Sequence, residues 1–148
     1  DVQRLQRLTP HVNLFVAAKA QWATAPLLSS EEFGVGGASF GRGYDPSEIV
    51  GDEGIAGKIE LQWNNPVKTR SFNDYQFFGF YDAGRTWNED ATSRPQKKEV
   101  LTSAGLGVRT EFVGKIKADL TFALPLNRDV QTKGGQDASL LFKLSRSF

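Results

Sequence analysis

The sequence contains no cysteine, no methionine and a single histidine, His11. Without cysteine the chain cannot form disulfides, thiolate nucleophiles or cysteine-ligated metal sites. One histidine supports neither a catalytic dyad nor a histidine-ligated metal, so we expect no metal site, no cofactor and no enzyme activity. The missing methionine, and the lack of a charged-then-apolar leader at the start, predict a processed or excised chain.

The sequence also has little net charge and no long apolar run. The 148 residues carry a formal net charge of +1, which argues against the broad basic surface that nucleic acid binding needs. No apolar run approaches the roughly 18 residues of a membrane-spanning helix. The glycine-rich stretch 34–43 lacks the Gly-Lys-Ser/Thr ending of a phosphate loop, so nucleotide binding is not expected. If the protein crosses a membrane, it has to do so as a β-barrel.

Alternating apolar and polar residues predict an all-β fold with few helices. Apolar residues stand at every second position from Val12 to Trp22, and this period of two is typical of a strand. The same period returns in five later segments, and Val113-Gly114 is a candidate tight turn. The predicted strands cover residues 12–22, 55–63, 75–84, 100–112, 116–124 and 139–148, and residues 2–8 resemble the remnant of a seventh.

Most predicted strands carry charges on their polar face, which leaves two interpretations. A soluble antiparallel sheet with one solvated face is the commoner arrangement. A membrane barrel is favoured by strand lengths near ten residues, by aromatic residues at strand ends, and by connections that are alternately short and long. The charged residues concerned are Lys19, Lys58, Glu60, Asp82, Arg109, Glu111, Lys117, Asp119 and Lys143.

The glycine-rich stretch from Glu32 to Glu48 is the most distinctive part of the sequence. It resembles the large inward-folded loop of two-partner secretion transporters, the haemolysin activation/secretion protein family of the ShlB/FhaC/HecB type. In that family a glycine-rich approach leads to a Val-Arg-Gly-Tyr/Phe tetrad. The corresponding residues here are Gly41, Arg42, Gly43 and Tyr44, of which Gly41 departs from the usual valine.

A second motif of the same family lies in the predicted strand at residues 75–84. The family carries Phe-x-Asp-x-Gly, and this chain has Phe80, Asp82 and Gly84 at that spacing. An inward loop must be held against water and against its own entropy, and an arginine offers a planar fork of donors to a carboxylate. We therefore predict that Arg42 pairs with Asp82, while the glycines beside Arg42 allow a tight turn.

The end of the chain resembles the family's assembly signal, which has apolar residues at alternate positions and a terminal aromatic residue. Phe142, Leu144 and Phe148 fit this pattern, and Arg146 stands where an apolar residue is usual. An arginine near the membrane interface can extend its charged group into water. The resemblance implies that the barrel assembly machinery is a partner during biogenesis.

The resemblance follows the strand order over essentially the whole chain. It implies an all-β, transmembrane antiparallel β-barrel, of which residues 1–148 supply the carboxy-terminal strands, with a long inward-folding loop at residues 29–54. Six strands cannot enclose a lumen that holds so many charges. The family's barrel has sixteen strands.

The function implied by the resemblance is protein transport. The protein would be a pore in the outer membrane of a Gram-negative bacterium, surrounded by outer-membrane lipid. It would translocate an unfolded partner exoprotein of the adhesin or haemolysin type to the cell surface by two-partner secretion. The energy would come from folding of the exoprotein outside the cell, without nucleotide hydrolysis.

Two alternative functions remain open at this point. An outer-membrane protein assembly insertase of the same superfamily would share the wall and the loop, and the number of domains before the barrel in the full gene would distinguish it. A soluble β-barrel that binds a small apolar ligand would share the alternation, and fractionation with and without detergent would distinguish that one.

Overall fold

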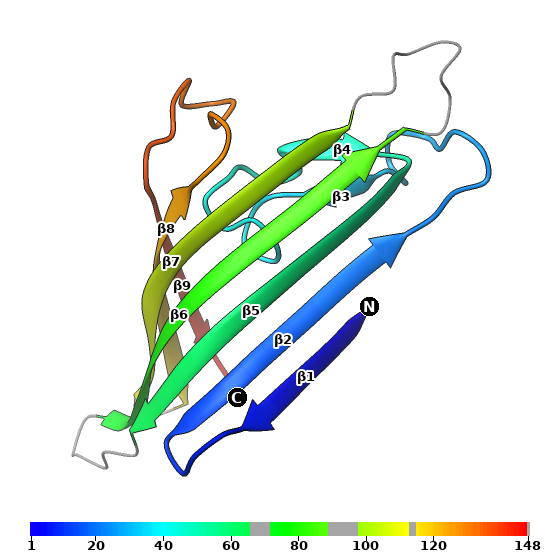
Figure 1. The fold of residues 1–148 in the computed structure, drawn as a ribbon. Coiled ribbons are helices and arrows are strands. Elements are labelled where there is room, and N and C mark those ends of the chain that lie inside the picture. Colours follow the sequence, from blue (N-terminus) through cyan, green and yellow to red (C-terminus); the bar gives the residue numbers. More distant parts are fainter. Residues whose placement is uncertain (66–71, 89–97, 113–114, 148) are drawn as a thin grey trace.

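A computed structural model of the chain contains a curved antiparallel sheet (Figure 1). The structure describes residues 1–65, 72–88, 98–112 and 115–147. Each strand of the main sheet pairs with its neighbour along the chain. In order across the sheet, the strands are β1 (Val2–Arg7), β2 (Val12–Gln21), β5 (Glu53–Asn65), β6 (Phe72–Trp87), β7 (Glu99–Phe112), β8 (Ile116–Pro125) and β9 (Ser139–Arg146).

Two short strands, β3 (Phe33–Val35) and β4 (Ile49–Gly51), form a separate two-stranded sheet within the connection from β2 to β5. None of the residues described forms a helix that is long and apolar enough to span a membrane. Every element of the described residues is a strand, and this confirms the predicted all-β class.

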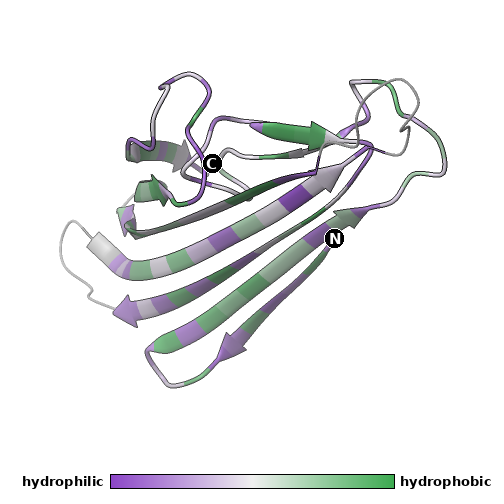
Figure 2. Ribbon diagram, turned by 45° about the horizontal axis from the view of Figure 1, so that its top comes forward, coloured by the Kyte–Doolittle hydropathy of each residue, from purple (hydrophilic) through white to green (hydrophobic). Residues whose placement is uncertain are grey.

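The period-two pattern places each strand's residues on two distinct faces of the sheet. The register aligns charged residues across neighbouring strands, for example Lys58 opposite Asp82, and Arg109 opposite Asp119. Figure 2 shows apolar and polar residues alternating along the strands. Because the register is shared from β2 to β9, most of the charges gather on the concave face and most of the large apolar side chains on the convex face.

The predicted strands agree with the observed ones, with differences at their ends. Residues 2–8, interpreted as a remnant, contain the regular strand β1, which pairs with β2 throughout. Strand β5 begins at Glu53, so the last two residues of the predicted loop 29–54 belong to the sheet. The predicted turn Val113-Gly114 and the terminal Phe148 lie outside the described residues.

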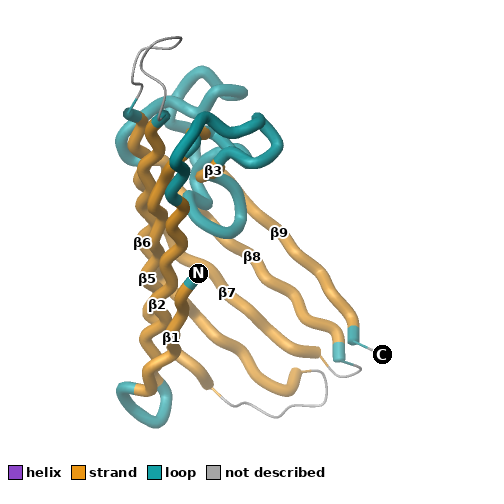
Figure 3. Tube along the Cα trace, turned by 90° about the vertical axis from the view of Figure 1, so that its right-hand side faces the viewer, coloured by secondary structure: helices purple, strands orange, loops and turns teal. Residues whose placement is uncertain are grey.

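The sheet does not close, because β1 and β9 each pair on one side only. Figure 3 shows the strands from β1 to β9 curving around a concave side, with the larger loop segments, drawn in teal, near the upper end. An open edge in a membrane would leave backbone amides and carbonyls without partners. The described strands therefore have the geometry of one part of a barrel wall.

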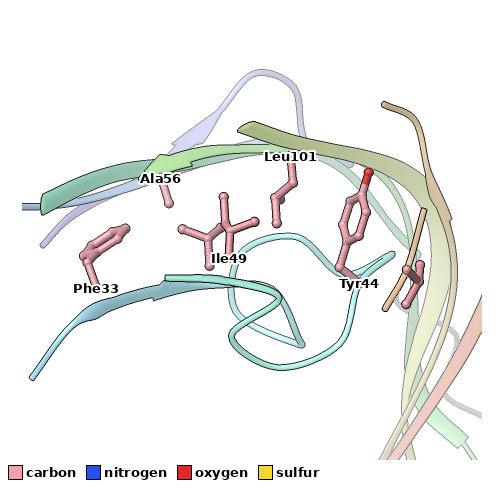
Figure 4. Close-up of a cluster of buried hydrophobic side chains, with 7 residues drawn as sticks. Phe33, Tyr44, Ile49, Ala56 and Leu101 are labelled. Atoms are coloured by element: carbon pink, nitrogen blue, oxygen red, sulfur yellow. The ribbon is translucent and has the colours of Figure 1, made fainter. Parts of the chain in front are cut away.

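The main apolar core lies between the connection at residues 29–54 and the concave face of the sheet. Phe33, Ile49 and Tyr44 of the connection face Ala56 and Leu101 of the sheet (Figure 4). Val35 and Val130 complete this buried cluster. The connection is thus packed against the wall as part of the folded structure, and it brings its glycine-rich tip onto the charged face.

Candidate functional site

The inward loop, residues 29–54, turns back on itself at its tip. The amide of Gly36 donates to the carbonyl of Phe40 at 2.8 Å, and the amide of Tyr44 donates to the carbonyl of Gly41 at 2.9 Å. Gly41 has a φ of 90°, a conformation that side chains with a Cβ rarely adopt. The departure from valine at this position is therefore matched to the turn that this loop makes.

Arg42, at the loop tip, binds Asp82 of β6 through its side chain and its backbone. Nε donates to Oδ2 at 3.0 Å, and Nη2 donates to Oδ1 at 2.8 Å. The backbone amides of Gly41 and Arg42 also donate to Asp82 Oδ2, at 3.1 and 3.0 Å. Asp82 is 0% exposed, so four donors from the loop satisfy a fully buried carboxylate. The contact predicted from the two separate motifs is present.

Glu60 of β5 connects Arg42 to a second arginine, Arg109 of β7. Arg42 Nη1 donates to Glu60 Oε2 at 2.8 Å, and Arg109 Nη1 donates to Glu60 Oε1 at 2.6 Å. Arg109 also donates from Nε to Asp119 of β8 at 2.7 Å. We call these five residues, Arg42, Glu60, Asp82, Arg109 and Asp119, the ion cluster. It links the loop to four neighbouring strands.

In the sequence, Glu60 and Arg109 belong to no motif and are two of several charges on the polar faces of the strands. The sequence does place both on the same face as Asp82, which is the one signal that could have singled them out. The strand register determines which charges on that face are neighbours. It places Glu60 opposite Phe80 and Arg109 opposite Gln76. Without that register they cannot be told apart from the other charges.

Two aromatic rings form a floor beneath the guanidinium groups. The Cζ of Arg42 lies 3.5 Å from the ring centroid of Phe80, and that of Arg109 lies 3.8 Å from the ring centroid of Phe78. Arginine combines such stacking with hydrogen bonds in its plane. This explains why strand β6 carries aromatic residues on its charged face, and it gives Phe80 of the motif a stacking role.

Gly84, the last residue of the strand motif, makes room for the loop. A Cβ on Gly84 would lie 2.5 Å from Val35 Cγ1 of β3. Gly43 is equally close to the wall, since a Cβ there would lie 2.7 Å from the backbone nitrogen of Pro125. Both glycines therefore permit an approach of loop and sheet that any larger residue would prevent.

Tyr44, the last residue of the tetrad, is buried and binds residues outside the ion cluster. Its Oη lies 3.0 Å from the carbonyl oxygen of Thr102 and 2.9 Å from Oδ1 of Asn127. Both Arg42 and Tyr44 of the tetrad therefore bind the wall through their side chains.

The charge on Arg42 is well stabilised in this site. Burial would lower the pKa of Arg42, but the hydrogen bonds and charges of Asp82 and Glu60 outweigh it and raise the pKa. The arginine therefore stays protonated under any condition in which the site is intact.

The predicted assembly-signal residues lie apart from the loop. Phe142 and Leu144 are exposed on the convex face of β9, opposite Leu120 and Ala118 of β8. Phe148 lies outside the described residues.

The arrangement can hold a loop, and its chemistry matches that task. Among the described residues, no group of three or more His, Asp or Glu side chains could hold a metal ion. The hydrogen-bonding capacity of Asp82 is directed at the loop, and that of Glu60 at Arg42, Arg109 and Gln62. The site therefore fixes the inward loop against the polar, concave face of the sheet.

Comparison with known proteins identifies the family. The model of the family described as haemolysin secretion/activation protein ShlB/FhaC/HecB matches residues 3–110. This range includes the inward loop, the strand motif and both arginines of the ion cluster. No curated protein and no solved structure gives a significant match. Because the family model covers well over half of the chain, the chain belongs to the haemolysin secretion/activation protein family ShlB/FhaC/HecB.

Proposed function

We propose that this chain is the carboxy-terminal part of an outer-membrane pore that secretes a partner exoprotein. The single observation that carries the proposal is the inward loop fixed by Arg42 on the buried carboxylate of Asp82, in a chain of a secretion/activation family. A wide polar pore needs an element that restricts it. A loop held in the lumen by charged hydrogen bonds meets that need, and it can be released without breaking the wall.

The convex face supports a lipid environment for the wall. Large apolar side chains stand exposed along successive strands, and Leu106 of β7 is 64% exposed. A continuous apolar surface of this kind is rare on soluble monomers. It is expected on the lipid-facing side of a membrane barrel, where apolar residues alternate with polar residues of the lumen. This favours the outer membrane over the soluble ligand-binding barrel.

The lengths of the connections indicate which end of the strands faces the periplasm. Along the chain, β1 and β2, β5 and β6, and β7 and β8 are separated by 4, 6 and 3 residues. In contrast, β2 and β5, β6 and β7, and β8 and β9 are separated by 31, 11 and 13 residues. Outer-membrane barrels have short turns at the periplasmic side and longer loops outside. The inward loop then enters the lumen from the cell surface.

A hollow lined by charged side chains lies beside the loop tip on the concave face. It has a volume of about 450 Å³, and its lining includes Arg42 of the loop with Lys58, Glu60, Arg109 and Lys143 of the strands. Such a surface offers hydrogen bonds of both kinds and charges of both signs to an extended polypeptide. An unfolded exoprotein, of the adhesin or haemolysin type, is the substrate that we propose.

The assembly insertase of the same superfamily is the second candidate. The match to a secretion/activation family favours export over insertion. In either case we propose that Phe142, Leu144 and Phe148 form the signal by which the barrel assembly machinery inserts the protein. Deletion of Phe148 should then lower the amount of folded, heat-modifiable barrel in the outer membrane.

Co-expression of the full gene with a neighbouring gene for a large exoprotein tests the proposal. We expect the exoprotein at the cell surface with the wild-type transporter, and in the periplasm with Arg42→Ala. The matched control is Arg85→Ala, which removes an exposed arginine from the opposite face of the strand that carries Asp82. Export that is independent of the transporter, together with defective assembly of other barrels, would contradict secretion and favour the insertase.

A further inference from the structure

The connection between β8 and β9, residues 126–138, contacts the inward loop through residues outside the ion cluster. We propose that this connection is a clasp: a second anchor that holds the inward loop in the lumen and has to open before the loop can leave. The ion cluster fixes the loop tip at Arg42, whereas the clasp fixes the segment that follows the tip. Only the purpose of loop release, which is to open the pore for the exoprotein, rests on the proposed function.

Val130 is the apolar anchor of the clasp. It is 1% exposed and belongs to the buried cluster formed by the inward loop and the wall. A tight turn presents it, because the amide of Val130 donates to the carbonyl of Gly135 at 2.9 Å and its own carbonyl accepts from Gly134 at 2.9 Å. Gly134 has the positive φ of 63° that such a turn favours. The turn therefore inserts one valine into a core that otherwise belongs to the loop and the sheet.

Gln131 is the polar anchor of the clasp, and it binds Glu48 in two places. Its backbone amide donates to Glu48 Oε1 at 2.9 Å, and its side-chain Nε2 donates to the Glu48 carbonyl at 2.8 Å. Thr132 adds a hydrogen bond from Oγ1 to Asp45 Oδ2 at 2.6 Å. Glu48 is buried, and its Oε2 has no hydrogen-bond partner among the residues described. Gln131 thus satisfies half of a carboxylate that the loop itself leaves unsatisfied.

Asn127 ties the base of the clasp to the wall. Its Nδ2 donates to the carbonyl of Val100 at 2.9 Å, and its Oδ1 accepts from the amide of Thr102 at 2.7 Å. Arg128 pairs with Glu99 at 3.1 Å. The contacts with Val100, Thr102 and Glu99 belong to β7, so the clasp can remain attached to the wall when the loop moves. Asn127 also binds the loop, because its Oδ1 accepts a hydrogen bond from Tyr44 Oη at 2.9 Å.

The geometry of the clasp suits an anchor that opens. Gln131 and Thr132 are exposed to solvent although their partners belong to the loop, and only Val130 is fully buried. Segments with few buried contacts and solvent-exposed hydrogen bonds open at lower free energy than the core. In the ion cluster, in contrast, Arg42, Glu60 and Asp82 are all buried. Opening therefore begins at the clasp.

The test uses a thiol beneath the loop, since the sequence contains no cysteine of its own. Ser103 of β7 is fully buried under the loop, and Ser103→Cys changes its volume little. A membrane-impermeant maleimide added to intact cells labels this thiol when the loop lifts. We expect Val130→Ser and Gln131→Ala to raise the labelling rate at least about threefold, as expected when a local opening becomes easier.

Two controls separate loop release from damage to the wall. Gln136→Ala changes an exposed residue of the same connection and should leave labelling at the Ser103→Cys background rate. Heat-modifiable migration of the barrel should be the same in all variants. Equal labelling of Val130→Ser, Gln131→Ala and the control would overturn the clasp.

The readout does not require export. If the full transporter exports no exoprotein while the labelling differences remain, the proposed function fails and the clasp stands. If export is normal and labelling does not respond to the clasp variants, the clasp fails and the proposed function stands.

Discussion

Glu60 holds two guanidinium groups at once, and this makes it the least replaceable residue of the ion cluster after Asp82. It is 3% exposed and accepts hydrogen bonds from Arg42 and Arg109. Loss of Glu60 leaves both arginines short of one partner in a buried site. Loss of Arg109 leaves Glu60 its bond to Arg42, and the Arg109 side chain is itself 35% exposed.

We therefore predict that Glu60→Ala destabilises loop docking far more than Arg109→Ala does. Removing one partner of a buried pair costs roughly 3–5 kcal/mol, whereas a partly exposed pair is worth roughly 0–1 kcal/mol. Thermal unfolding of the purified barrel in detergent measures the difference. Glu111→Ala, on the same face with a long contact to Lys117, is the control. Equal effects of Glu60→Ala and Arg109→Ala would mean that Glu60 does not join the two arginines.

Steric fit can be separated from charge at Gly84. We predict that Gly84→Val displaces the loop with the ion cluster chemically intact, because the added Cβ would lie 2.5 Å from Val35 Cγ1. Gly79→Val is the matched control on the opposite face of the same strand, where a Cβ would meet nothing closer than 3.9 Å. Protease cleavage of the loop in purified protein is the measurement. Cleavage that is equally slow in both variants would show that the loop does not need this close approach.

Part of the site was predictable at the residue scale. Arg42 and Asp82 lie in two motifs that the family shares, and their pairing followed from complementary charge. Glu60 and Arg109 belong to no such motif, and their selection depends on the strand register. The clasp residues Val130 and Gln131 could not be predicted, because an isolated valine in a polar connection has no periodic pattern.

At the scale of elements, the strands were readable because a half-buried strand imposes a period of two. The short strands β3 and β4 were missed, since glycines interrupt their apolar residues and three-residue strands have too little pattern. The family motifs predicted that the loop lies inward, but they did not predict the two-stranded sheet within it. The side chains of this small sheet pack on the wall. What positions such a segment is tertiary packing, which local sequence does not encode.

We predict that spin labels on the two faces of the sheet report different environments. Labels at Leu61 and Leu120, on the convex face, should report contact with lipid. Labels at Lys117 and Lys143, on the concave face, should report water. Glu60 is unsuitable as a lumen position because the ion cluster buries it. Continuous-wave spectra with oxygen and a water-soluble relaxant provide the measurement, and similar water exposure at all four positions would contradict the barrel wall.

At the scale of the whole molecule, the described strands form an open wall with one loop folded onto it. The edges at β1 and β9 need partners in a membrane, and a charged concave face needs a wide lumen. A larger barrel meets both needs, and a sixteen-stranded one is what we propose. In such a barrel the inward loop would occupy the pore, and we propose that the bond between the loop and the wall controls the path of the exoprotein.

A double-mutant cycle between Arg42 and Asp82, read out as export of the exoprotein by the full transporter, tests this claim most directly. Arg42→Ala and Asp82→Ala should each impair export, since each leaves a partner charge uncompensated. Residues in direct contact depart from additivity by roughly 0.5–3 kcal/mol, so the double variant should lose less than the two single effects combined. Arg85→Ala is the control and should export normally. Strictly additive effects, or normal export by Arg42→Ala, would contradict the account.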